Sequence, residues 1–243
     1  VAIVSDGTRV LGLGDIGPEA AMPVMEGKAA LFKTFGDVDA VPICIDTKDP
    51  AKIIETVRFL QPSFAGINLE DISSPKCYDI ECELKKICDI PVFHDDQHGT
   101  AIACLAAVIG ALRFVKKYMK TAKFVVNGCG AAGSAIGRLL ISMGAENVTM
   151  VDRFGALYEG IDANLDRIQS YLATVTNKEH KKGTLADIAK GADVLIGVSA
   201  PNVFTKEIIA SMADKAIVFA LANPVPETSY ADAIEAGAAV AGT

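Results

Sequence analysis

Two pairs of neighbouring carboxylates are the residues in this chain best suited to chemistry. Asp95 and Asp96 stand where a short apolar run gives way to a predicted helix, and Glu70 and Asp71 close another apolar run. If both runs are parallel strands, their carboxyl ends meet at the edge where open α/β sheets hold ligands. Clustered carboxylates repel one another, and their oxygens suit Mg²⁺ or Mn²⁺. The two pairs together predict a divalent metal site, whereas either pair alone is equally compatible with capping the following helix.

A glycine-rich turn at residues 128–133 is the second motif with a chemical use. It has the form G-x-G-x-x-G between an apolar run and a predicted helix, which is typical of dinucleotide-binding folds. Its glycines allow a tight turn and close approach to a pyrophosphate, which the helix amino terminus attracts. Asp152 ends the next apolar run, 24 residues after Gly128, and favours NAD through hydrogen bonds to ribose hydroxyls, while Arg153 could hold the 2′-phosphate of NADP. The predicted cofactor-binding residues are Gly128, Cys129, Gly130, Ala131, Ala132, Gly133 and Asp152.

Alternating apolar and helical patterns predict the elements that position these motifs. Two short strands are expected around residues 6–8, followed by a helix that starts at Pro18. Further strands are expected at residues 40–45, 64–69, 91–94, 124–127, 148–152, 194–198 and 216–221, with another starting at 240. Helices are expected at residues 50–60, 75–88, 98–119, 132–143 and 206–212, with two more between 161 and 189.

Regular βα alternation predicts an α/β fold with parallel sheets covered by helices. We expect a Rossmann-type, doubly wound dinucleotide-binding domain at residues 123–243. A second α/β domain for substrate and metal would precede it at residues 1–112, and residues 113–122 would connect the two.

The composition favours small-molecule chemistry. The chain has 243 residues, 51% of them hydrophobic, enough for one large or two modest domains. It has 23 basic and 30 acidic residues, a net charge of −7, and no basic run longer than two residues. This balance argues against nucleic acid and anionic membranes as partners. No apolar stretch is expected to reach the length of a bilayer span, and no signal sequence is expected, so we predict a cytoplasmic protein.

The cysteines and the chain ends carry two further expectations. The six cysteines form no C-x-x-C pair and mostly have apolar neighbours, which predicts reduced core thiols rather than disulfides or a zinc site. The chain begins without Met inside a predicted strand and ends as another strand starts, so we expect the middle of a longer protein. The cysteines are Cys44, Cys77, Cys82, Cys88, Cys104 and Cys129.

Several sequence blocks follow one another in an order that is specific to one enzyme family. The blocks are VSDG (4–7), LGLGDIGP (11–18), PVMEGK (23–28), NLEDI (68–72), HDDQHGTA (94–101), GCGAAG (128–133) and LANP (221–224). With these blocks, which run through almost the whole chain, the sequence resembles malic enzymes of the shorter bacterial and archaeal type. The resemblance implies oxidative decarboxylation of L-malate to pyruvate and CO₂, with NAD or NADP and with Mg²⁺ or Mn²⁺. It also implies a homodimer or a higher homo-oligomer.

The resemblance also implies roles for individual residues. By motif, the metal ligands would be Glu70, Asp71 and Asp96, with Asp95 as an adjacent catalytic carboxylate that does not bind the metal. Lys28 would contact malate and act as the general base that accepts the proton of the C2 hydroxyl. A lysine does this near neutral pH only if its pKa is lowered, which partial burial and a bound cation would both do.

Three other residues have alternative readings. Asn223 resembles the asparagine with which the family holds its substrate, and the alternative is a turn residue before Pro224. His94 and His98 stand four residues apart and could suggest a metal pair, but a predicted strand-to-helix break separates them. The family does not use these histidines as ligands.

The resemblance leaves two matters open. The family's general-acid tyrosine would precede Val1 and a further asparagine-containing segment would follow Thr243, so it is open whether this chain alone turns over. The alternatives to a malic enzyme are a malolactic enzyme, which retains NAD and releases lactate, and a non-catalytic NAD-binding module.

Overall fold

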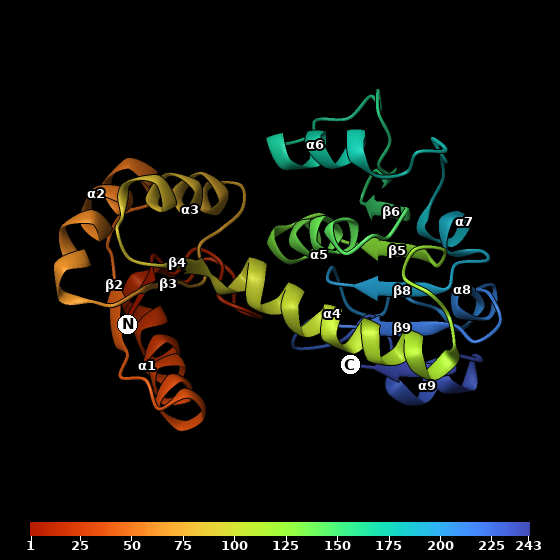
Figure 1. Cartoon of the computed structure of the whole chain (residues 1–243), viewed down its shortest axis with the longest axis horizontal. Helices are drawn as coiled ribbons and strands as arrows, with labels where there is room; N and C mark the ends of the chain where they lie inside the picture. The colour runs from red at the N-terminus through yellow and green to blue at the C-terminus, as the bar shows by residue number, and fades with distance from the viewer. The chain divides into compact units, whose positions relative to one another are not determined.

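The chain forms two compact units, each built on its own sheet (Figure 1). The computed structural model describes residues 1–243. The units are Val1–Gly99 and Thr100–Thr243, so the division falls inside one helix, α4 (Asp95–Val115). Both units are α/β, as the regular alternation predicts.

The first unit is a four-stranded, fully parallel sheet in the order β2-β1-β3-β4. Because β3 and β4 are neighbours, with Leu69 opposite His94, the segments that follow these two strands start side by side. The strands are β1 (Ala2–Ser5), β2 (Val41–Cys44), β3 (Ile67–Leu69) and β4 (Val92–His94). The helices are α1 (Gly17–Gly36), α2 (Pro50–Leu60) and α3 (Lys76–Ile87), with a 3₁₀ turn η1 (Gln61–Ser63) after α2.

Local sequence explains why α2 matches the prediction at both ends. Pro50 occupies the first turn, and the Asp49 side chain accepts a hydrogen bond of 2.9 Å from a backbone amide of that turn. Proline and a capping aspartate are both favoured at this place, because the first amides of a helix have no partner inside it. Ile53 and Val57, four residues apart, are fully buried and lie on one face.

One of the two strands predicted around residues 6–8 is absent. β1 forms, but the segment after it contains only an isolated bridge between Val10 and Gly14. Gly7 and Gly12 have φ angles of 64° and 77°, and Gly14 and Gly17 also have positive φ. Repeated left-handed backbone turns the chain instead of extending it, so the prediction of a second strand here is wrong.

The second unit has a six-stranded sheet in the order β10-β9-β8-β5-β6-β7, parallel except for β7. Helices α4, α5 and α6 cover one face, and α7, α8 and α9 cover the other. Along β5, Phe124 and Val126 point into the first of these cores and Val125 points into the second. The unit is therefore doubly wound and of Rossmann type, as predicted.

The bounds of its elements follow the expected alternation. The strands are β5 (Lys123–Asn127), β6 (Asn147–Asp152), β7 (Gly155–Ala156), β8 (Val194–Gly197), β9 (Ile217–Ala220) and β10 (Val240–Gly242). The helices are α5 (Ala131–Ser142), α6 (Arg167–Val175), α7 (Leu185–Ala189), α8 (Lys206–Ala210) and α9 (Tyr230–Glu235).

Helix α4 departs from the sequence predictions in three ways. It spans Asp95–Val115 rather than residues 98–119, so it ends earlier than predicted and the Asp95-Asp96 pair lies in its first turn. The division between the units comes before the predicted connecting segment 113–122, because Ala101, Cys104 and Val108 of α4 already pack in the core of the second unit.

By length and composition, α4 is also apolar enough to cross a membrane, contrary to the expectation that no stretch would be. A single such helix is weak evidence for a membrane span, because core helices pass the same test.

Candidate active site

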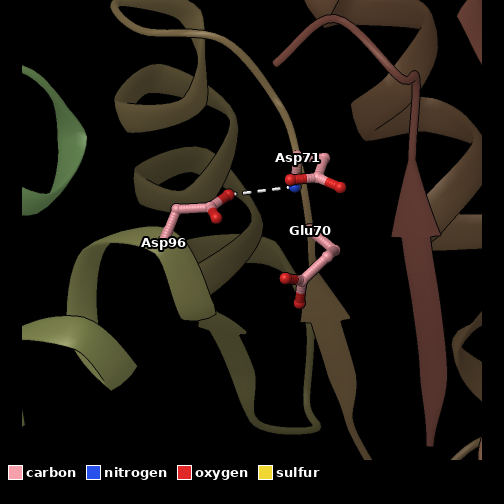
Figure 2. A group of neighbouring side chains, drawn as sticks. All are labelled: Glu70, Asp71 and Asp96. Atoms are coloured by element: carbon pink, nitrogen blue, oxygen red, sulfur yellow. Dashed lines mark hydrogen bonds between the residues drawn. The ribbon is translucent and has the colours of Figure 1, made fainter. Parts of the chain in front are cut away.

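The structure brings together the two carboxylate pairs of the first unit. Glu70 and Asp71 directly follow β3, while Asp96 comes from the first turn of α4, after the neighbouring strand β4. Each of these three residues offers one carboxylate oxygen, and the three oxygens lie within 4.8 Å of one another (Figure 2). Parallel pairing of β3 with β4 thus gathers residues that are 25 positions apart in the sequence.

Backbone contacts hold the cluster in place. The amide of Asp71 donates a hydrogen bond of 2.9 Å to Oδ2 of Asp96, which is the dashed line in Figure 2. The carbonyl of Asp71 accepts a hydrogen bond of 2.9 Å from the amide of Arg9. Asp71 itself has a left-handed φ of 54°, a conformation that is uncommon outside glycine but that aspartate adopts more readily than most residues.

The electrostatics of the cluster favour a bound cation. Burial, with the charge of Asp96, raises the pKa of Glu70 to about 6. Burial, with the charges of Asp96 and Glu70, raises the pKa of Asp71 to about 7. Three buried or half-buried carboxylates supply hard oxygen ligands that repel one another when ionised, and Mg²⁺ or Mn²⁺ would relieve that repulsion. The donor set therefore fits the divalent metal that the sequence predicts.

Lys28 lies against the same cluster. It comes from the middle of α1, and its Nζ is 2.5 Å from Oδ2 of Asp95 and 3.1 Å from Oε2 of Glu70. Its side chain is 21% exposed, so it is not the solvated surface lysine that helical position alone would indicate. Asp95 therefore contacts this ammonium, whereas Asp96 lies in the carboxylate cluster with Glu70 and Asp71.

The pKa of Lys28 depends on its protein neighbours. Burial lowers it, as anticipated, but the hydrogen bond to Asp95 and the negative charges of Glu70 and Asp95 outweigh burial. The net pKa is raised above the ordinary value for lysine. The expectation of a lowered pKa also invoked a bound cation and stays a prediction; among the protein groups, the two neighbouring carboxylates outweigh burial.

Two residues that the sequence analysis did not single out support these carboxylates. The side-chain amide of Asn68 donates a hydrogen bond of 2.8 Å to Oε2 of Glu70. Gly99 stands one turn after Asp95 in α4, and a methyl group there would collide with the Asp95 carboxylate. Glycine at this position therefore leaves the space that Asp95 fills. Neither residue has a sequence signal beyond its place in the blocks at 68–72 and 94–101.

The two histidines contact different groups. His98 Nε2 lies 2.7 Å from Oε1 of Glu81 in α3, and His94 Nε2 lies 3.2 Å from Oδ2 of Asp96. Burial raises the pKa of Glu81, but hydrogen bonds from His98 and Lys85 outweigh it and bring the pKa to about 2. The structure does not bring the two ring nitrogens to a common ligand position.

The glycine-rich turn of the second unit has the geometry that its sequence predicts. It joins β5 to α5, and Gly128 has a φ of 111° with no room for a side chain, because a Cβ would lie 2.7 Å from the carbonyl oxygen of Val198. At Gly133 a Cβ would strike the carbonyl of Gly128, so only glycine lets α5 pack this closely on the turn. Gly130 has open space around it and precedes a helix whose first turn no side chain caps. Uncapped amides at a helix amino terminus can receive a phosphate.

Asp152 ends β6 and its carboxylate is held by two donors. Oδ1 accepts a hydrogen bond of 2.8 Å from the Arg153 amide, and Oδ2 accepts one of 2.9 Å from the side chain of Gln169. Gln169 is fixed in turn by a capping box with Asp166 at the start of α6. The D-x-x-Q spacing is a recognisable signature of such a cap, and it could have identified Gln169 from the sequence. The guanidinium of Arg153 lies over the ring of Phe154, 4.8 Å from its centre.

Asn223 is exposed in the loop after β9, at the carboxyl end of that strand. The loop is tied down by Glu227, a fully buried residue that the sequence analysis did not identify. Its Oε2 accepts a hydrogen bond of 3.0 Å from the amide of Ala222, and its Oε1 accepts one of 2.8 Å from the amide of Ser199. Asn223 therefore stands on a fixed loop.

Comparison with known proteins agrees with this architecture. Residues 1–52 match the family profile described as "Malic enzyme, N-terminal domain", and residues 97–241 match "Malic enzyme, NAD binding domain". The chain is 54% identical over its whole length to the bifunctional malic/malolactic enzyme of Bacillus subtilis, and it covers 59% of that protein. It is 55% identical over 93% of its length to the NAD-dependent malic enzyme of Geobacillus stearothermophilus and covers 47% of it.

A solved structure gives the same result. The crystal structure of an NAD-dependent malic enzyme from Thermotoga maritima matches 99% of this chain with a TM-score of 0.97 and 50% identity, and the chain covers 64% of that structure. The chain belongs to the malic enzyme family. It spans less than two thirds of the length of each of these relatives.

Proposed function

We propose that the protein to which this chain belongs oxidises and decarboxylates L-malate to pyruvate and CO₂, with NAD⁺ or NADP⁺ as the hydride acceptor and Mg²⁺ or Mn²⁺ as the metal. The observation that carries the proposal is the contact of Lys28 with Asp95 and Glu70, beside three gathered carboxylates. A binding module has no need of a half-buried lysine between two carboxylates at a metal-ligand cluster, so this contact supports an enzyme over a non-catalytic NAD-binding module.

Each residue of the first unit has a distinct part in this proposal. Glu70, Asp71 and Asp96 would hold the metal, which would supply Lewis-acid stabilisation of the negative charge that develops on the substrate. Lys28 would accept the proton of the malate C2 hydroxyl at Nζ. Asp95, whose Oδ2 lies 2.5 Å from Nζ, would orient the lysine and accept that proton from Nζ. A cation among the carboxylates would offset the negative charge that now raises the pKa of Lys28.

The second unit would bind the dinucleotide. Its glycine-rich turn would receive the pyrophosphate, and Asp152 would accept hydrogen bonds from the adenosine ribose, which favours NAD over NADP. Two observations support that preference. Gln169 and the Arg153 amide hold the Asp152 carboxylate, and the guanidinium of Arg153 packs on Phe154.

Malolactic activity is a second candidate function. The observation that favours it is the 54% identity to the Bacillus subtilis protein named as a bifunctional malic/malolactic enzyme. In such a reaction NAD would stay bound and lactate would be released. The two candidates share the residues described above and differ in the product.

The test uses the full-length protein with L-malate, Mn²⁺ and either NAD⁺ or NADP⁺. Malic enzyme activity predicts NADH or NADPH formation with one pyruvate for each reduced cofactor. Malolactic activity predicts lactate without net cofactor reduction. Absence of both products in the presence of metal and cofactor would refute both candidates.

A further inference from the structure

We propose that His94 is a positioning residue that orients the carboxylate of Asp96, and that Gln97 and Glu81 set the ring of His94 for this task. The inference rests on the proposed metal site, in which Asp96 is a ligand. Carboxylates that bind a metal are commonly oriented by a hydrogen bond from a neighbouring residue, and Asp96 would need such a donor. No sequence pattern identifies His94 for this role. A histidine at the end of a short buried strand has no feature that sets it apart from other strand residues.

The position of His94 is the first observation. It is the last residue of β4, it is fully buried, and its Nε2 lies 3.2 Å from Oδ2 of Asp96. At its present angle this contact falls short of a hydrogen bond, and Nε2 has no other partner. A buried polar atom without a partner is destabilising, and Oδ2 of Asp96 is an acceptor within reach.

The second observation fixes which nitrogen of His94 carries the proton. The side-chain nitrogen of Gln97 lies 3.1 Å from Oε2 of Glu81 and 3.0 Å from Nδ1 of His94. A carboxylate only accepts, so it is the NH₂ end of Gln97 that faces Glu81. That same nitrogen then donates its other hydrogen to Nδ1, which must be the acceptor. The ring proton is therefore on Nε2, the nitrogen that lies 3.2 Å from Oδ2 of Asp96.

The third observation is that buried and bonded side chains surround this arrangement. Gln97 and Glu81 are buried, and Glu81 is also held by His98 at 2.7 Å and by Lys85 at 2.7 Å. On the other side, Oδ2 of Asp96 already accepts the amide of Asp71. Both the Asp71 amide and Nε2 of His94 therefore lie against Oδ2 of Asp96. Oδ1 of Asp96 is then the oxygen available to a metal.

The experiment measures Mn²⁺ affinity of the full-length protein by the electron paramagnetic resonance signal of free Mn²⁺, without substrate or turnover. His94→Phe keeps the ring volume and removes the donor. We expect its Mn²⁺ dissociation constant to rise by about 10–100-fold, the usual effect of removing a partner of a metal ligand. NADH affinity should stay within about twofold of wild type. His98→Gln is the matched control, because His98 bonds the same Glu81 without reaching Asp96, and its Mn²⁺ affinity should change less than threefold.

Gln97→Met keeps His94 but removes the group that fixes its tautomer, and it should also weaken Mn²⁺ binding. If His94→Phe does not fold, the Mn²⁺ affinity of Gln97→Met tests the inference instead. Wild-type Mn²⁺ affinity in a folded His94→Phe or Gln97→Met variant would overturn the inference, and so would equal weakening in His98→Gln. Asp96→Ala separates this failure from failure of the metal site itself. If Asp96→Ala abolishes Mn²⁺ binding while His94→Phe leaves it intact, the metal site stands and only the role of His94 is refuted.

Discussion

The ammonium of Lys28 and the carboxylate of Asp95 lie 2.5 Å apart, although the two residues are separated by 67 positions in the sequence. One comes from the middle of a helix and the other from the first turn of a different helix. Their contact turns an ordinary helical lysine into a half-buried group beside a carboxylate cluster, and the first two predictions concern it.

Lys28→Ala in the full-length enzyme should reduce kcat for malate oxidation by about 10²–10⁴-fold, the usual contribution of a general acid or base. Added small primary amines should restore part of the rate by replacing the lost group. Lys33→Ala is the control, because Lys33 lies in the same helix with a side chain that is 56% exposed. Steady-state kinetics of both variants check this. A near-normal kcat for Lys28→Ala across pH 6 to 9 would remove Lys28 from the mechanism.

Gly99→Ala should reduce kcat by about 10²-fold, because the added methyl group collides with the Asp95 carboxylate and turns it away from Lys28. Gly110→Ala in the same helix has open space around the new methyl group. That control should keep full activity and change stability by no more than about 1 kcal/mol. Equal activity of the two variants would show that the position of Asp95 is unimportant.

The stability of the protein without divalent metal should fall as the pH rises from about 4 to 7. The folded-state pKa values of Glu70 and Asp71 are raised to about 6 and about 7, from 4.5 and 3.8. The contribution of these two carboxyls to the free energy of unfolding is fully present below about pH 4. It is lost as the pH rises through their raised pKa values, at about 1.4 kcal/mol for each unit by which a pKa is raised. Thermal unfolding in EDTA at several pH values measures this.

The matched variant for that measurement is Asp71→Asn, which removes one of the two raised carboxyls. Its unfolding temperature should depend less on pH over this range. Added Mn²⁺ should stabilise the wild type most at the higher pH, where the carboxylates are ionised. An identical pH dependence in wild type and Asp71→Asn would contradict the assignment.

Asp152→Asn should lower kcat/KM for NAD⁺ by about 10–100-fold. Hydrogen bonds to a charged acceptor contribute about 1.5–3 kcal/mol, and asparagine removes the charge. The value for NADP⁺ should fall less or rise, because repulsion of its 2′-phosphate is relieved. Kinetics with both cofactors check this. A wild-type kcat/KM at least tenfold higher for NADP⁺ would instead show that Arg153 determines the preference.

The sequence predicts the parts of the fold that depend on local pattern. The helix at Pro50–Leu60 has a proline, a cap and buried residues at helical spacing, and it forms with these bounds. The doubly wound second unit follows from βα alternation and the glycine-rich turn. The sequence patterns do not predict the strand Gly155–Ala156 or the helix Tyr230–Glu235. The first is a two-residue strand and the second a helix of less than two turns, so neither has a usable period.

The parts of the site that depend on tertiary contacts were harder to predict. Acidic pairs at two strand ends indicate a cluster because parallel strands end at the same edge. By contrast, the raised pKa of Lys28 depends on two partners that only the folded chain supplies. The support from His94 and Gly99 likewise comes from side chains that meet in three dimensions, and no spacing rule identifies either residue.

Mn²⁺ binding by wild type and by Asp96→Ala, measured calorimetrically on the full-length protein, tests the proposed metal site beside Lys28 most directly. The wild type should bind Mn²⁺ at this cluster, and Asp96→Ala should lose that binding because one of three gathered ligands is gone. NADH affinity should be largely unchanged, since the dinucleotide motif lies in the other unit. Unchanged Mn²⁺ affinity in Asp96→Ala would contradict the assignment of Glu70, Asp71 and Asp96 as the metal ligands.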